Sequence, residues 1–223
     1  MSAELVSRLL SYLYMLPCVL IAITFHEAAH GYTAYRLGDP TAKALGRLTL
    51  NPLKHLDPIG ALCMLLFRFG WAKPVPVNSR YFKKPRRDMA LVAIAGPLTN
   101  VLLALIGVIL YRLCGSLFSA YTAPQGSFAL SAQYTVLTLL SYFFSLNASF
   151  AVFNLLPIPP LDGSRILSIF LPANLYAALA KYERYISLAL LVLLWLGILD
   201  GPLSFLVNAL LNGMFRITAF LSF

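Results

Sequence analysis

The sequence contains few charged residues and few cysteines. Only 11% of its 223 residues are charged and 60% are hydrophobic, whereas a soluble globular domain is about 25% charged and about half apolar. So few polar side chains cannot cover a water-facing surface, which excludes an ordinary soluble domain and predicts an integral membrane protein. The cysteines (Cys18, Cys63 and Cys114) are odd in number and far apart, so they provide neither a disulfide framework nor a cysteine-based zinc motif.

Acidic side chains are scarce in the one strongly charged segment. Residues 36–87 contain 11 of the 17 basic residues but only two acidic ones, Asp39 and Asp57. Cytoplasmic loops of membrane proteins collect Lys and Arg, so we expect this segment to face the cytoplasm and the N-terminus to lie outside. No nucleic-acid-binding motif accompanies the basic residues. The expected partner is therefore the lipid bilayer, with no nucleic acid.

Long apolar runs predict the membrane-spanning helices. Residues 203–223 are also apolar but include Arg216, so they either span the membrane or lie at its surface. The chain is interpreted as an all-α polytopic membrane protein that forms one domain, multi-pass in the cell membrane. The expected spans cover about residues 9–37, 89–113 and 134–156, with a fourth from near Tyr185 to a break at Asp200-Gly201-Pro202.

The basic segment has a different local pattern. Residues 44–50 alternate weakly and residues 75–78 read as extended, which predicts short membrane-associated strands. Residues 58–69 are apolar but too short to cross a bilayer, so they predict a buried or interfacial helix. No internal repeat is visible. The expected architecture is a three-helix core with additional C-terminal helices and these short strands in the first cytoplasmic segment.

The first predicted span carries the motif HExxH, from His26 to His30. Histidines at positions i and i+4 lie on one helix face, so both imidazoles can reach one metal ion. Glu27 lies about 100° further round the helix, where it can act on a water molecule rather than bind the ion. Ionisable residues at bilayer depth are costly and usually mark function, so this motif is a candidate catalytic metal site.

A third metal ligand is needed, because catalytic zinc has three protein ligands and one open position. Asp162 follows the third predicted span, at the end of the stretch NLLPIPPLDG over residues 154–163. Three prolines in four positions cannot continue a helix. Non-helical backbone at membrane depth is tolerated only where it is buried in protein or lines a wet cavity. Both motifs approach the cytoplasmic side, so Asp162 can meet His26 and His30 there.

The paired motifs resemble those of the site-2 protease family of intramembrane zinc metalloproteases. That family combines an FHEAAH-type motif on a transmembrane helix with a distant NxxPxPxLDG-type motif, here residues 25–30 and 154–163. The chain is similar to the minimal members of the family, and we expect neither a PDZ domain nor cystathionine-synthase-type domains. The resemblance extends to GRLTLNPLKHLDPIG at residues 46–60, WAKPVPVN at 71–78 and AGPLTN at 95–100.

The resemblance implies a site and a reaction. His26, His30 and Asp162 would bind one Zn²⁺ per chain, and Glu27 would be the general base. The implied enzyme is an intramembrane zinc metalloendopeptidase of the HExxH plus LDG type. Its substrates would be transmembrane proteins or peptides, cut within or near the bilayer, and the site would open toward the cytoplasm. The sequence specifies neither the physiological substrate nor the oligomeric state.

Supporting residues follow from the same resemblance. Asn154 would lie beside the active site and orient the substrate backbone. Gly96, Pro97 and Asn100 would belong to the second helix of the catalytic core. His55 matches a recurrent family position without an assigned role.

Two other functions are compatible with metal-binding residues in a membrane. One is a metal transporter, in which the same His and Asp residues form a transit site. Transporters often contain repeats with broken helices in corresponding places, whereas this chain has one broken segment and no repeat. The other is a non-proteolytic scaffold, which has no need for Glu27 between two ligands.

Overall fold

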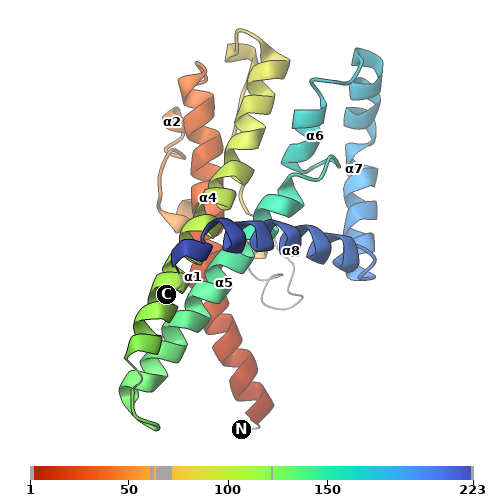
Figure 1. The fold of residues 1–223 in the computed structure, drawn as a ribbon. Helices are drawn as coiled ribbons and strands as arrows, with labels where there is room; N and C mark the ends of the chain where they lie inside the picture. The colour runs from red at the N-terminus through yellow and green to blue at the C-terminus, as the bar shows by residue number, and fades with distance from the viewer. Residues whose placement is uncertain (1–2, 61–62, 64–71, 122, 222–223) are drawn as a thin grey trace.

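Three long helices form the centre of the structure, a computed structural model that describes residues 3–60, 63, 72–121 and 123–221. They are α1 (Ala3–Arg36), α4 (Pro85–Ala120) and α5 (Phe128–Asn154). Each is long and apolar enough to cross a membrane. They pack side by side, with the α4–α5 turn and the N-terminus at one end of the molecule (Figure 1). The expectation of an all-α, multi-pass membrane protein with a three-helix core is confirmed.

Local sequence explains where the core helices begin. α4 starts at Pro85, which is tolerated in a first turn because its missing N–H needs no partner there. Asp88 reaches back and accepts a hydrogen bond from the Lys84 N–H at 3.0 Å. α5 follows Ser127, whose hydroxyl accepts from the Leu130 N–H at 3.2 Å. These contacts satisfy N–H groups that an isolated helix end leaves free.

Small residues allow the three helices to approach closely, as is typical of membrane helix bundles. A Cβ atom on Gly107 of α4 would lie 2.9 Å from atoms of Phe143 and Phe144 on α5. The largest buried apolar cluster lies at this contact and includes one residue of α8: Ala104, Val108, Phe144, Ala148 and Met214.

The connection between α1 and α4 contains short helices rather than the expected strands. They are α2 (Thr41–Ala44), η1 (Pro52–Lys54) and η2 (Ser79–Tyr81). Residues 45–50 are turns, bends and irregular backbone after the end of α2, and among the described residues the connection forms only an isolated bridge between Leu56 and Ala72. Residues 58–60 are helical, but 61–62 and 64–71 of the expected helix over 58–69 lie outside the described residues.

Residues 73–78 are extended without a strand partner, because side chains bind their backbone. Pro74 and Pro76 have no N–H to donate to a sheet. The Arg47 guanidinium donates to the Lys73 carbonyl at 2.7 Å and to the Pro74 carbonyl at 3.3 Å. The predicted strand at residues 75–78 was therefore wrong as a sheet element, although its extended backbone is present.

The C-terminal third differs from expectation in two ways. It contains α6 (Asp162–Leu167), α7 (Ala173–Trp195), α8 (Asp200–Ile217) and η3 (Ala219–Leu221). α7 begins 12 residues before the expected start near Tyr185 (185 − 173), because its charged residues are exposed on the helix rather than ending it.

The second difference is at the predicted break. Gly197, with φ of 71°, lies in the break, and Asp200-Gly201-Pro202 forms the first turn of α8, where proline is tolerated. α8 is bent by 85° from α7 and crosses α4 and α5 (Figure 1). Arg112 of α4 donates to the Phe215 carbonyl at 2.7 Å, near the end of α8.

Asp39 attaches residues 73–78 to the end of α1. Its buried carboxylate accepts hydrogen bonds from the backbone N–H groups of Asn78 at 2.7 Å and Thr41 at 3.0 Å, and from the Thr41 hydroxyl. Burial alone would raise the pKa of Asp39, but these hydrogen bonds stabilise the charged form and lower the pKa below its ordinary value.

Asp39→Asn is expected to lower the free energy of unfolding by about 1–3 kcal/mol at neutral pH, because its amide NH₂ would face an N–H donor. A lowered folded-state pKa means that the carboxylate's stabilisation is complete above the unfolded-state pKa, about 3.9. The stabilisation is lost as pH falls through the folded-state value. Thermal unfolding in detergent from pH 7 to pH 3 should show the two proteins converging; a constant difference would contradict this account.

Candidate active site

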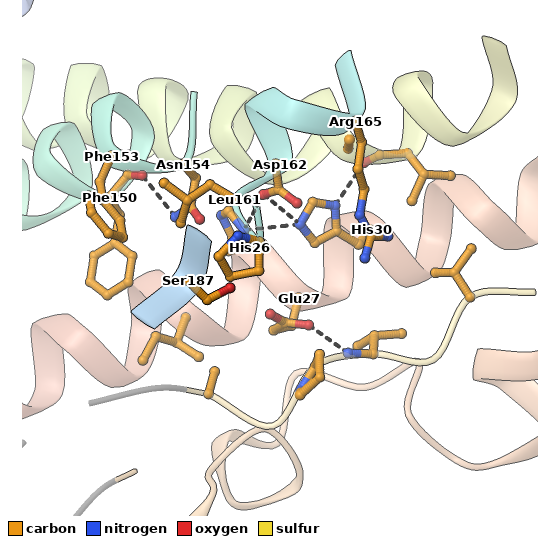
Figure 2. A pocket seen from close by; sticks show the side chains of 18 of the residues that line it. His26, Glu27, His30, Phe150, Phe153, Asn154, Leu161, Asp162, Arg165 and Ser187 are labelled. Atoms are coloured by element: carbon orange, nitrogen blue, oxygen red, sulfur yellow. Dashed lines mark hydrogen bonds and ion pairs between the residues drawn. The ribbon is translucent and has the colours of Figure 1, made fainter. Parts of the chain in front are cut away.

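His26 and His30 on α1 and Asp162 at the start of α6 converge on one point (Figure 2). The Asp162 Oδ2 atom lies 3.1 Å from His26 Nε2 and 3.2 Å from His30 Nε2, and the two Nε2 atoms are 3.0 Å apart. Two ligands of tetrahedral zinc, each about 2.0 Å from the ion, lie about 3.3 Å apart. This triangle therefore fits a zinc ion. The described residues hold no other group of three or more His, Cys, Asp or Glu arranged in this way.

The other nitrogen of each imidazole contacts an oxygen atom of α4. His26 Nδ1 lies 2.6 Å from the Asn100 side-chain oxygen, and His30 Nδ1 lies 2.7 Å from the Val92 carbonyl. Both oxygens accept, so each ring carries a proton on Nδ1 and directs the Nε2 lone pair toward Asp162. Partners of this kind orient metal-binding histidines and set their tautomer. Asn100 was expected near the site; the Val92 carbonyl was missed, because a backbone group leaves no mark in the sequence.

Gly96 of α4 lies directly against the two imidazoles. A Cβ atom at this position would be 2.5 Å from His30 Nε2 and 2.7 Å from His26 Cε1. Any side chain larger than hydrogen would push the rings out of place. The glycine in AGPLTN is therefore required by the contact between α4 and the histidines.

Asp162 is positioned by the turn that follows α5. Residues 155–161 form turns and bends rather than helix, as the prolines predict, and α6 begins at Asp162. Gly163 has no room for a side chain against the backbone carbonyls of Leu155 and Leu156.

Glu27 lies beside the triangle and is held by the extended segment. Its Oε2 atom accepts a hydrogen bond from the Val75 N–H at 2.7 Å (Figure 2). Its other oxygen has no hydrogen bond to the described part of the chain. This contact was missed from the sequence, although the extended piece at residues 75–78 was noted.

A cavity of 440 Å³ opens over these groups. Asn154 lines it, with its amide donating to the Phe150 carbonyl at 3.0 Å. His55 does not line it: this residue is fully buried, and its Nε2 lies 2.8 Å from the Thr49 carbonyl. Its backbone carbonyl accepts from the Lys73 N–H at 2.9 Å, so His55 supports the segment beside Glu27. The polar lining consists of His26, Glu27, His30, Asn154, Asp162, Arg165 and Ser187.

Two buried histidines, a half-buried aspartate and a neighbouring glutamate among apolar helices form an arrangement that fits a membrane metallohydrolase. The sequence profile of peptidase family M50 matches residues 14–197. The chain therefore belongs to peptidase family M50, the site-2 protease family, and is an intramembrane zinc metalloprotease.

Similar proteins support this assignment. "Putative zinc metalloprotease YwhC" of Bacillus subtilis (strain 168) is 46% identical over 181 residues, which cover 81% of this chain and 79% of that protein. "Putative zinc metalloprotease Rip2" of Mycolicibacterium smegmatis is 30% identical over 209 residues, 85% of this chain and 75% of that protein. The protein of the same name in Mycobacterium tuberculosis (strain ATCC 25618 / H37Rv) is 31% identical over 188 residues, which cover 82% of this chain and 66% of that protein. No solved structure matches significantly.

Gly96→Ala is expected to displace both imidazoles and weaken zinc binding by at least about tenfold, the loss typical when the support of a metal ligand is disturbed. Zinc titration of detergent-purified protein measures this change. Gly115→Ala is the matched control, because Gly115 lies on the same helix and its Cβ would meet nothing within 4 Å. Equal zinc affinity in the two variants would show that the close approach of α4 is not needed.

Proposed function

We propose that His26, His30 and Asp162 bind the zinc ion and that Glu27 is the general base for hydrolysis of peptide bonds in membrane-embedded substrates. One observation carries the proposal. Three ligand atoms from two distant segments lie within 3.2 Å of one another, in a cavity that also contains Glu27. The zinc-ligand atoms are the groups that the HExxH and LDG motifs supply.

The chemistry requires a water molecule, a base and a proton donor for the leaving group. Zinc held by His26, His30 and Asp162 would lower the pKa of a water molecule toward neutrality and polarise the scissile carbonyl. Glu27 is oriented by the Val75 N–H and keeps one oxygen free, with which it takes the water proton and passes it to the amine that leaves. The water oxygen bonds to the carbonyl carbon and the C–N bond then breaks, which yields a carboxylic acid and an amine.

The substrate must be unwound before cleavage, because helical hydrogen bonds shield its carbonyl groups. The extended segment at residues 73–78 offers an edge for such a strand. Val75 and Val77 line the cavity, and the Val77 N–H has no partner in the described chain. Arg47 occupies the carbonyls of Lys73 and Pro74. Asn154, with a free side-chain oxygen, would bind a backbone N–H of the substrate.

The whole of residues 1–223 acts in this proposal as one membrane-embedded unit. The basic residues of the α1–α4 connection favour a cytoplasmic location for that side, with the N-terminus outside and the cavity opening inward. Membership of a peptidase family favours proteolysis over metal transport or a scaffold role.

Glu27→Gln is expected to lower the cleavage rate of a membrane-embedded substrate by about 10²–10⁴-fold, the usual contribution of a general base. Zinc content should stay at the wild-type level, because the glutamate is not a ligand in this proposal. Rate measurement in proteoliposomes, with metal analysis of the same samples, separates the two effects. Wild-type cleavage by the variant would rule out Glu27 as the base.

Asp162→Ala is expected to reduce zinc occupancy as strongly as His26→Ala does, because each variant leaves two of the three ligands. Metal analysis after detergent purification measures the loss, with Asp200→Ala as a control for the removal of an exposed carboxylate. Wild-type occupancy in Asp162→Ala would mean that the third ligand lies elsewhere.

A further inference from the structure

Asn147 is a fully buried polar residue two turns before the end of α5 and does not line the cavity. Burying an amide among apolar helices is costly unless its groups are hydrogen-bonded. Here both ends have partners: the amide nitrogen donates to the Phe143 carbonyl at 2.9 Å, and the oxygen accepts from the Asn100 amide nitrogen at 2.9 Å. An apolar side chain would pack at this position without that requirement.

The two asparagines link the α5 backbone to His26 by a chain of hydrogen bonds in which only one order of donors and acceptors is possible. The Phe143 carbonyl can only accept, so the nitrogen of Asn147 faces it and the oxygen faces Asn100. Asn100 must then present its nitrogen to Asn147, and the same nitrogen donates to the Ala22 carbonyl at 3.2 Å. Its oxygen is left for His26 Nδ1, at 2.6 Å.

The opposite orientation of the Asn100 amide is disfavoured by this arrangement. A flip would place its oxygen against two other oxygens, those of Ala22 and Asn147. It would also place an N–H against His26 Nδ1, which would then have to accept and leave the ring proton on Nε2. That tautomer has no lone pair to offer at the centre of the triangle.

We propose that Asn147 is a positioning residue for the metal site: it fixes the amide orientation of Asn100, and through it the tautomer of His26 that can bind zinc. The proposal rests on the role of His26 as a zinc ligand. Asn147 acts on the ion through two intervening side chains and touches neither the cavity nor the substrate.

Two variants separate the hydrogen bond from the packing. Asn147→Leu keeps the branching and the number of side-chain heavy atoms and removes the acceptor. Asn147→Asp keeps the shape; in an apolar site the acid stays protonated, so its hydroxyl donates to Phe143 and its carbonyl accepts from Asn100. Asn212→Leu, the same substitution at an exposed asparagine of α8, is the control.

Zinc titration is the first measurement. Asn147→Leu should weaken zinc binding by about 10–100-fold, the range for loss of an outer partner of a metal ligand. Asn147→Asp and Asn212→Leu should bind zinc as the wild type does. Wild-type affinity in Asn147→Leu, or an equal loss in a folded Asn147→Asp, would overturn the proposal. The melting temperature of each variant identifies any that fails to fold.

The NMR signal of the His26 Nδ1–H, in protein labelled with ¹⁵N-histidine, is the second measurement and does not depend on metal. In zinc-free protein the signal should be present in the wild type and Asn147→Asp and be shifted or lost in Asn147→Leu. An unchanged signal in the wild type and both Asn147 variants would overturn the proposed effect of Asn147 on the His26 tautomer. If the three proteins show the expected signals but the wild type binds no zinc, the effect of Asn147 on the His26 tautomer would be supported and the role of His26 as a zinc ligand refuted.

Discussion

Polar groups buried between apolar helices must find partners within the protein, and the site depends on this requirement. Two imidazoles on α1 expose two outer nitrogens to the interior of the bundle, where no lipid group can bind them. α4 provides both partners, the Asn100 side chain and the Val92 carbonyl. For these two oxygen atoms to contact the imidazoles, α4 must approach α1 so closely that only glycine fits at position 96. The orientation of the two histidines therefore depends on the close contact between α1 and α4.

The same requirement links the proposed base to the connection between α1 and α4. Residues 73–78 have no strand partner in the described part of the chain, and side chains of Arg47, Glu27 and Asp39 bind their backbone instead. One of these side chains is the proposed general base. The position of the Glu27 carboxylate therefore depends on a segment whose other contacts lie away from His26, His30 and Asp162. A substitution at Arg47 or Asp39 can alter catalysis by moving this segment, although neither residue is a candidate metal ligand.

The sequence was informative where one helix or one motif determines the geometry. The HExxH spacing places His26 and His30 on one face because helix geometry is fixed. The proline-broken segment after the third predicted span indicated Asp162, and the family resemblance then implied that it is a ligand. The sequence was not informative where the hydrogen-bond partner of a site residue is a backbone group or lies on a distant element. The Val92 carbonyl and the Val75 N–H have no side-chain signature. Asn147 could have been noticed, since it lies two helical turns before Asn154 (154 − 147 = 7) in an otherwise apolar run.

The predicted strands were wrong, and the break between α7 and α8 lies a few residues before its predicted position, for a related reason. An alternating pattern describes one strand but says nothing of the neighbour that must pair with it, and here side chains replace that neighbour. Asp-Gly-Pro can end one helix or begin the next, and only packing decides. Because α8 buries Met214 against Val108 and Phe144, its direction is set by α4 and α5. His26 and His30 lie on α1 and contact α4, and Asp162 follows the turn after α5. A zinc ion held by these three residues would therefore link the three core helices, and its binding energy would also stabilise the core.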